Sequence, residues 1–388
     1  MKIISVITKS IKEQIRSCWV LLLSLSMGPF FILVYFLITE TSKPQYNILL
    51  VNNDKGILID GQQINHGDYL TSFFRSSKTV TSTNPFTIDE TSDQIKGIER
   101  IKNKKSDVLI IIHDSFSQAL DKRRNNDTSG VLKVEFTGDL TNANYLIGAV
   151  WANEIINEYT LQATHTKRIV EVKETAIGTS ASISSFDMIV PGILIVSLIM
   201  LMFTASIAFV AEVENKTIMR LKLSKLSTFE FLGGVSVVQL LVGIISVVLT
   251  LITAIALGFH YAGSLLIMIF IAGLTSLSII SFSLIIAAIT KSANEVLVVG
   301  NFPMFLFMFF TGAAFPLKSS ALFTIAGYPI NIQGLMTPTH AISALNKTLI
   351  MDMDLTSILP EISSIIVLTI LYFLIGGIIF KQRHLKLT

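Results

Sequence analysis

The stretch that decides the fold runs from residue 302 to residue 317 and reads FPMFLFMFFTGAAFPL. Its first part is almost wholly aromatic and aliphatic, as is typical of a membrane-spanning helix. Gly312 and Pro316 then interrupt it, so a plain helix does not continue through them. Interrupted backbone at membrane depth is tolerated only where protein buries it or where it lines a cavity. Two interpretations follow: a helix that ends in an outer loop, or a span whose outer end turns back into the membrane as half-helices.

The composition of the chain is typical of a multi-pass α-helical membrane protein. Hydrophobic residues make up 51% and charged residues 15% of its 388 positions, whereas soluble proteins carry roughly a quarter charged residues. The formal net charge is only +3, which does not suggest a nucleic-acid partner. The single cysteine, Cys18, excludes an internal disulfide and a cysteine-based metal site.

Apolar runs of membrane-spanning length predict six transmembrane helices. The expected spans cover residues 19–38, 188–211, 231–259, 264–290, 296–310 and 362–380. The expected division of the chain is 1–17, 18–39, 43–185 and 188–388. The first of these regions is amphipathic, and is either a helix on the inner membrane surface or a basic flank that orients the first span. The second is the first span, and the last is a five-span membrane domain.

Residues 43–185 differ in character from the rest, because charged and polar residues return between short apolar runs. Strands are expected at residues 48–51, 78–83, 108–112 and 131–136, and helices at 69–74, 89–102, 115–122 and from Asn142 onward. This mixture predicts a compact extracytoplasmic α/β domain inserted between the first and second spans. Its histidines lack metal-ligand spacing and no nucleophile motif occurs, so we expect no catalytic residue and no metal site.

Basic residues near the span ends predict the orientation of the chain. They precede the first span and lie between the second and third spans, between the fourth and fifth spans, and after the sixth span. In a path of six spans these four positions fall on one side, which positive charge places in the cytoplasm. We therefore expect a bacterial plasma (inner) membrane protein with both termini in the cytoplasm.

The motifs around the fifth span resemble those of the permease (transmembrane) subunits of type-2 ABC exporters. Those permeases carry a Ser/Thr-Gly pair, an aromatic-Pro pair, a re-entrant outer hairpin and a later Pro-aliphatic patch. The matching residues here are Thr311-Gly312, Phe315-Pro316 and Pro338. The large domain after the first span is similar to that of the drug-resistance-like branch. The resemblance implies the re-entrant interpretation and places these residues beside the translocation path. Asn301, in the fifth span, either contacts cargo or holds helices together.

A second resemblance follows the second span. The family carries there a short helix, with an acidic pair, a Thr and an Arg-Leu pair, that docks on the ATPase subunit. The matching residues are Glu212, Glu214, Thr217, Arg220, Leu221 and Leu226. Lys216 stands where glycine is usual, which puts the tight turn in doubt. A generic basic loop is the alternative to an ATPase-coupling helix. Ser227 and Glu230 then form a predicted capping box that opens the third span.

The chain has no Gly-x-x-x-x-Gly-Lys-[Ser/Thr] motif, so it carries no phosphate-binding loop of its own. We therefore expect no enzyme activity and no cofactor in this chain, with ATP and Mg²⁺ bound by a separate cytoplasmic ABC ATPase. The resemblance implies a dimer with a second copy or a homologous permease, contact with membrane lipids, and room for an envelope adaptor protein.

The implied function is export of an amphipathic or lipid-like compound (a drug, an antibiotic or a lipid) out of the cytoplasm or the inner leaflet. The predicted spans contain almost no ionisable residue, which argues against an ion-coupled pump. The alternative is a membrane-anchored cell-surface receptor or envelope-assembly factor without transport. An anchor has no need of an ATPase-coupling helix, so that helix distinguishes the two hypotheses.

Overall fold

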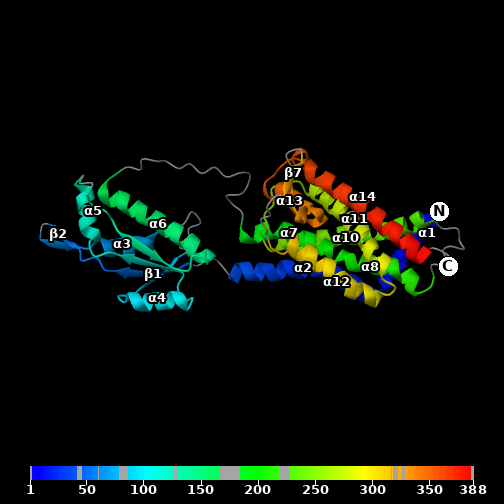
Figure 1. Cartoon of the computed structure of the whole chain (residues 1–388), viewed down its shortest axis with the longest axis horizontal. Coiled ribbons are helices and arrows are strands. Elements are labelled where there is room, and N and C mark those ends of the chain that lie inside the picture. Colours follow the sequence, from blue (N-terminus) through cyan, green and yellow to red (C-terminus); the bar gives the residue numbers. More distant parts are fainter. Residues whose placement is uncertain are drawn as a thin grey trace. The chain divides into compact units, whose positions relative to one another are not determined.

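The structure is a computed structural model that describes residues 2–41, 46–59, 61–77, 86–125, 127, 129–166, 184–217, 227–315, 317, 322–325 and 328–385. The chain divides into two compact units (Figure 1). One comprises Ser42–Glu174 and is called the inserted unit. The other comprises Met1–Thr41 with Thr175–Thr388 and is called the membrane unit.

The membrane unit is a bundle of long apolar helices. In the described part of the chain, six helical segments are long and apolar enough to cross a membrane, as the sequence predicts. They are α2 (Cys18–Thr41), α7 with α8 (Ser185–Ile199 and Leu201–Glu214), α10 (Thr228–Ala256), α11 (Leu265–Ile289), α12 (Ala293–Phe310) and α14 (Leu359–Phe380). The sixth helix begins three residues before its predicted start at residue 362 and therefore includes Glu361.

The helix bundle of the membrane unit has two ends. We call one the terminal end, because both ends of the chain lie there (Figure 1), and the other the insertion end. At the terminal end, Lys9 of α1 (Lys2–Arg16) pairs with Glu212, and the backbone of Ala293 reaches Glu214. At the insertion end, where the chain passes into and out of the inserted unit, Asp187 accepts a hydrogen bond from the backbone N–H of His260 at 3.0 Å. Each span therefore runs from one of these ends to the other.

Helix α1 docks on α10 through one face. Val6 is buried against Gly234, where a Cβ would lie 2.7 Å from Val6 Cγ1. The Gln239 amide donates to Gln14 Oε1 at 3.2 Å. Ile4 and Ile15 face away from the bundle and are exposed. An apolar stripe on the outward face is what a helix at a membrane interface requires.

The inserted unit is a layered α/β fold with strand order β4–β1–β5–β6. Parallel pairing joins β1 (Tyr46–Asn52) to β4 (Phe86–Glu90) and to β5 (Val108–Ile112), whereas β6 (Val134–Thr137) is antiparallel to β5. One face packs on α3 (His66–Ser76), α5 (Phe116–Arg124) and α6 (Ala143–Thr164), and the other on α4 (Gln94–Lys102), as Figure 1 shows. Alternate side chains of β1 and β5 enter the hydrophobic cores on the two opposite faces of the sheet. Because both faces are buried, the sequences of these two strands are apolar without interruption.

The sequence misassigned one edge of this sheet. The edge strand is β4, which ends at Glu90, whereas the sequence predicts that a helix begins at residue 89. Helix α4 begins only at Gln94, because the Asp93 carboxylate caps the backbone N–H groups of Ile95 and Lys96. The strand expected at residues 78–83 lies outside the described residues. The hairpin of β2 (Ile57–Ile59) with β3 (Gln62–Ile64) was not predicted.

The inserted unit is expected to fold without the spans, because both faces of its sheet are buried by its own helices. Residues 43–185 alone should give a soluble monomer with helix and strand signals in circular dichroism. Phe74→Ala, at a fully buried position, should lower the free energy of unfolding by about 3–5 kcal/mol. The matched control Tyr69→Ala, at an exposed position of the same helix, should cost less than about 1 kcal/mol. An aggregated parent fragment would contradict an independent domain.

Candidate functional site

A short helix enters the membrane unit between the fifth and sixth spans. Helix α13 (Thr337–Leu345) begins with Thr337, whose hydroxyl lies 2.7 Å from that of Ser278, and both side chains are fully buried. Ser278 lies near the middle of α11. Tyr372, deep within α14, donates its hydroxyl hydrogen to the Leu335 carbonyl at 2.8 Å. The start of α13 therefore lies halfway along the spans.

The other end of this segment returns to the insertion end. The π-helical turn η3 (Asn346–Ile350) follows α13, and the Leu349 carbonyl accepts a hydrogen bond from the Ala262 backbone at 2.9 Å. Ala262 lies in the turn between α10 and α11. Helix α13 with η3 thus runs from mid-depth to the insertion end, which agrees with the re-entrant interpretation and not with a simple outer loop.

One detail of the re-entrant interpretation is corrected by the segment between α12 and α13. Its described residues do not form a half-helix. They contain an antiparallel ribbon of β7 (Phe323–Ile325) with β8 (Tyr328–Ile330), followed by a single 3₁₀ turn, η2 (Gln333–Leu335). Aromatic and β-branched residues dominate both strands and favour extended backbone. Among the described residues of this segment, the part that re-enters the bundle as a helix is α13 with η3.

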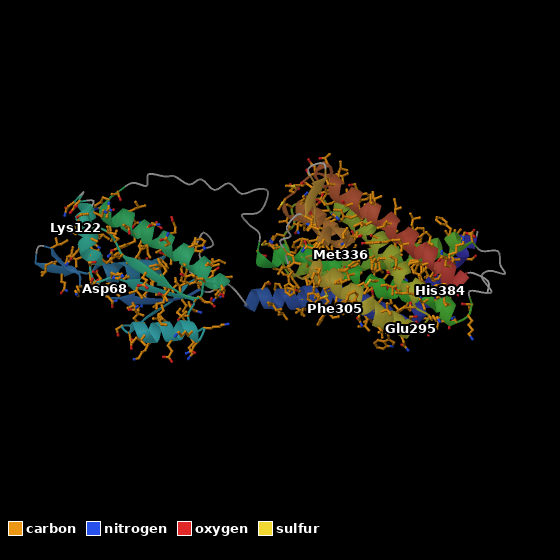
Figure 2. The ribbon with its side chains drawn as sticks, viewed as in Figure 1. Asp68, Lys122, Glu295, Phe305, Met336 and His384 are labelled. Atoms are coloured by element: carbon orange, nitrogen blue, oxygen red, sulfur yellow. The ribbon has the colours of Figure 1, made fainter. Side chains whose placement is uncertain are left out.

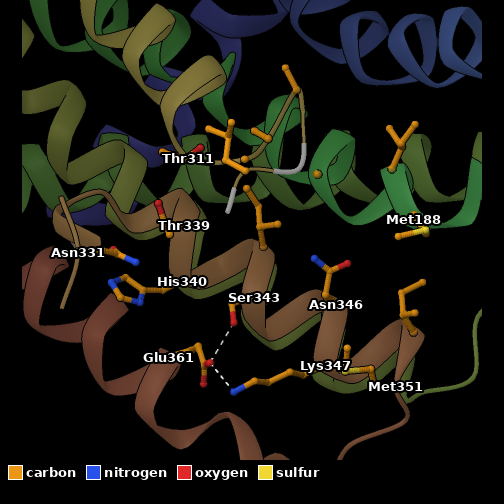
Figure 3. A pocket seen from close by; sticks show the side chains of 18 residues that line it. Met188, Thr311, Asn331, Thr339, His340, Ser343, Asn346, Lys347, Met351 and Glu361 are labelled. Atoms are coloured by element: carbon orange, nitrogen blue, oxygen red, sulfur yellow. Dashed lines mark hydrogen bonds and ion pairs between the residues drawn. The ribbon is translucent and has the colours of Figure 1, made fainter. Parts of the chain in front are cut away.

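A cavity of about 740 Å³ lies beside this helix (Figure 3). Its walls come from the start of α7, the segment that follows α12, and α13 with η3. Thr311 and Gly312, both expected at the translocation path, line it. Thr311 is buried and its hydroxyl donates to the Phe307 carbonyl oxygen. Gly312 has φ +88°, a conformation that favours glycine and turns the chain away from α12.

The segment after α12 is held by two neighbouring helices. Gly192 of α7 lies so close that a Cβ there would be 2.5 Å from the Ala313 carbonyl oxygen. The hydroxyl of Tyr35 on α2 donates to the Ala314 carbonyl at 2.8 Å. The cavity wall is thus in direct contact with the first and second spans.

One charged pair belongs to this cavity and was missed from the sequence. Glu361, in the first turn of α14, is 2% exposed and lines the cavity. Its Oε1 accepts hydrogen bonds from Lys347 Nζ at 2.6 Å and from Ser343 Oγ at 3.0 Å (Figure 3). The expected sixth span began one residue after Glu361, so its carboxylate was left among loop residues. The sequence predicts spans with almost no ionisable residue, and Glu361 is an exception that the predicted start at residue 362 leaves out. The available signal was an acidic residue at the edge of an apolar run.

The other residues expected at the path lie elsewhere. Phe315 is exposed and stacks on Phe309, with ring centroids 6.3 Å apart. Pro338 is buried in the first turn of α13, where proline is tolerated. Asn301 is exposed on α12 and does not line the cavity. Pro316 lies outside the described residues.

The acidic pair expected to couple to the ATPase lies at the terminal end, where the two carboxylates make different contacts. Glu212 is 6% exposed, forms an ion pair with Lys9, and accepts a hydrogen bond from the Thr217 hydroxyl. Glu214 is exposed, and its Oε2 accepts a hydrogen bond from the Ala293 backbone at the start of α12, at 2.9 Å. Glu212 therefore holds α1 against the end of α8, and Glu214 holds the start of α12 against it.

The turn that follows forms with lysine in place of glycine. Lys216 has φ +55°, the left-handed conformation that a glycine adopts at lower cost. Ser227 and Glu230 form the predicted capping box at the start of α10. Arg220, Leu221 and Leu226 lie outside the described residues, so the predicted coupling helix itself is not described.

The inserted unit offers a polar contact but no metal cluster within its described residues. His66 Nδ1 lies 2.8 Å from the Tyr159 hydroxyl. Burial lowers the pKa of the His66 imidazole, and burial raises the pKa of the Tyr159 phenol. At neutral pH both groups are therefore uncharged, and the contact joins α3 to α6.

A comparison with protein families agrees with a multi-pass helical membrane fold. The model of the family described as ABC-2 family transporter protein matches residues 16–378. The chain belongs to this family. It is therefore an ABC-2 permease, a transmembrane component of an ABC transporter, and its family implies partnership with an ABC ATPase subunit. No curated protein and no solved structure matches the chain.

Two helical paths in this permease connect its terminal end to the cavity. The first is α7 with α8, which carries Gly192 at the cavity and Glu212 and Glu214 at the opposite end. The second is α12, which receives the Glu214 contact at its start and leads into Thr311 at its end. Both helices thus reach from the terminal end of the bundle to the cavity wall.

Proposed function

We propose that this permease is the membrane subunit of an ATP-driven exporter that moves an amphipathic or lipid-like compound out of the cytoplasm or inner leaflet. The observation that carries the proposal is the family match along residues 16–378. The cavity supports the cargo class, because Met188, Ile342 and Ile350 give it an apolar wall while Glu361 and Asn346 give it a polar one. Ligand sites of this kind are mostly apolar with a few placed polar groups.

The proposed orientation has the terminal end in the cytoplasm of a bacterium and the inserted unit outside. Support comes from basic residues at the terminal end, including Lys9, Lys216, Lys291 and Arg383. A separate ATPase subunit then docks at the turn after α8 and drives both α8 and α12. Because Glu212 is buried, its proposed role in coupling is to hold α1 against that turn. Glu214 is exposed, so the ATPase subunit can contact it directly.

A second copy of the chain, or a homologous permease, is proposed to pack on α12. Asn301 is exposed on this helix, and Phe302 and Phe305 are exposed as well. Figure 2 labels Phe305 on α12. An amide that faces hydrocarbon without a partner is costly. A protein neighbour at this face supplies the hydrogen bonds that lipid tails do not offer.

Isolation of the permease from its native membranes tests the proposal. The tagged full-length chain, extracted in a mild detergent, should retain an ABC ATPase that mass spectrometry identifies, at about equal amount. The preparation should hydrolyse ATP, and replacement of residues 218–226 by a glycine-serine linker of equal length should remove the ATPase while leaving the permease in the membrane. A preparation with no ATPase would favour the alternative, a surface receptor or envelope-assembly factor anchored by its spans.

A further inference from the structure

The outward face of α6 changes from apolar to polar halfway along the helix. Four large apolar side chains in its first half are exposed: Leu146, Ile147, Val150 and Trp151. The residues seven positions further along, which about two helical turns bring back to the same face, are also exposed: Asn153, Glu154, Asn157 and Glu158. Water solvates a polar face, whereas a contiguous apolar patch on a protein surface marks an interaction site. The first half of α6 therefore presents a surface that suits a partner.

The apolar half of α6 lies at the edge of the sheet where β1 begins. A Cβ at Gly148 would lie 3.4 Å from the Cβ of Tyr46, the first residue of β1. Only residues 42–45 separate Tyr46 from Thr41, the last residue of α2, and an extended chain covers at most about 3.6 Å per residue. This short covalent link keeps the edge close to the surface of the membrane that α2 crosses.

A turn rich in lysine adjoins the apolar half of α6. It begins at the end of α4 and exposes three side chains: Lys102, Lys104 and Lys105. The Asn144 amide at the start of α6 donates to Asp107 Oδ1 at 3.5 Å, just after the turn. A hollow of about 360 Å³ is lined by Lys102 and Lys104 from the turn and by Asn142, the residue before α6. Positive charge and exposed apolar side chains therefore share one edge of the inserted unit.

The net charge of this edge is positive. Residues 102–107 and 138–142 hold three lysines and two aspartates. Both carboxylates already have partners within the chain, because Asp107 accepts a hydrogen bond from the Asn47 backbone at 2.9 Å and Asp139 accepts one from the Thr141 backbone at 2.9 Å. Lysine is depleted at protein–protein interfaces, whereas lysine beside tryptophan and aliphatic residues is typical of a surface that binds anionic lipid. A bilayer therefore suits this edge better than a second protein does.

We propose that this edge of the inserted unit docks on the membrane surface and binds anionic phospholipid there. The docking surface comprises Lys102, Lys104 and Lys105 together with Leu140 and the apolar half of α6. The aliphatic side chains and Trp151 enter the boundary between headgroups and acyl chains. The lysine ammonium groups contact lipid phosphates, and the polar half of α6 stays in water. The inference is independent of the proposed export function, since it needs neither ATP nor cargo.

Trp151 reports on this docking directly, because the chain has only two tryptophans. The full-length Trp19→Phe permease is reconstituted into vesicles of phosphatidylcholine with an equal part of phosphatidylglycerol, with or without bromine on the acyl chains. Bromine quenches tryptophan on contact, so Trp151 emission should be at least about two-fold lower in the brominated vesicles. The matched control adds Trp151→Phe and Leu58→Trp, which moves the tryptophan to an exposed position just beyond the other end of β1. Bromine should leave the emission of this control unchanged.

The role of charge is tested by Lys102→Gln with Lys104→Gln in the same Trp19→Phe background. Each lysine near an anionic surface shifts a binding equilibrium about five-fold, so loss of two should lower the ratio of docked to free unit about thirty-fold and remove most of the quenching. Omission of phosphatidylglycerol should also reduce the quenching. Lys122→Gln with Arg124→Gln is the matched control, because Arg124 lies near His66, which contacts the polar half of α6. This control should keep the quenching unchanged.

Trp151 emission that bromine leaves unchanged would overturn the inference. If Trp151 were at the same time shielded from aqueous iodide, the apolar half of α6 would be covered by protein, such as a second copy, instead of lipid. Equal quenching with and without phosphatidylglycerol, or full quenching in Lys102→Gln with Lys104→Gln, would overturn the binding of anionic lipid. The vesicles contain no ATPase, so the proposed function is tested separately.

Discussion

Replacing Lys9 by methionine is expected to destabilise the permease more than replacing Lys9 and Glu212 together. Lys9→Met leaves the Glu212 carboxylate charged and buried, and the Thr217 hydroxyl is then its one remaining partner among the described residues. Removing one partner of a buried ion pair typically costs about 3–5 kcal/mol. Because the Lys9 side chain is 42% exposed, water screens part of this cost, and we expect about 1–3 kcal/mol. Adding Glu212→Gln removes the stranded charge and should restore most of the stability.

A double-mutant cycle in detergent-solubilised permease measures this asymmetry. Four proteins are compared by thermal unfolding: the parent, Lys9→Met, Glu212→Gln and the double variant. Lys12→Met, at an exposed position of the same helix, is the control and should behave like the parent. If Lys9→Met and Lys12→Met unfold at the same temperature, the Lys9–Glu212 ion pair does not hold α1 against α8.

Replacing Gly192 by alanine is expected to reduce transport at least about ten-fold while leaving the chain in the membrane. The added Cβ would lie 2.5 Å from the Ala313 carbonyl oxygen and 3.5 Å from that of Gly312. Backbone atoms cannot swing aside as a flexible side chain can, so the segment after α12 must shift. Overpacking of this kind costs about 1–3 kcal/mol, enough to depopulate one arrangement of the cavity wall ten-fold.

The matched control is Gly377→Ala in α14, where no described atom outside the adjoining backbone of the helix lies within 4 Å of an added Cβ. This substitution should leave transport unchanged and raise helix stability slightly, because alanine favours a helix over glycine. Both variants are measured by ATP-driven transport at equal expression. Gly192→Ala with the activity of the parent would show that the cavity wall formed by residues 311–314 does not need its present position.

The parts of the fold that the sequence predicts are those that depend on local pattern. Long apolar runs predict the spans, and Ser227 with Glu230 predicts the start of α10, because both signals lie within a few neighbouring residues. The strand at β5 follows in the same way from five consecutive apolar residues. These elements need no knowledge of their partners in space.

The parts that the sequence does not predict depend on residues far apart in the chain. Lys9 and Glu212 are separated by 203 positions, so nothing in the local pattern shows that the acid is buried by a helix at the start of the chain. Glu361 looked like a loop residue because the apolar run begins after it, and only its contact with Lys347 reveals its place. The β7–β8 ribbon was not predicted because each strand is only three residues long, too short for an alternating pattern to be recognised.

The central claim is that this permease moves a lipid-like molecule at the expense of ATP hydrolysed by a partner, and transport by inverted membrane vesicles tests it most directly. Vesicles that contain the permease with its co-isolated ATPase are loaded in the outer leaflet with a fluorescent short-chain lipid. Dithionite, which bleaches only exposed fluorophore, then reports what has moved to the interior. The account predicts that ATP, but not a non-hydrolysable analogue, increases the protected fraction, and that vesicles without the permease show no increase. Equal protection with ATP, with the analogue and without the permease would contradict it.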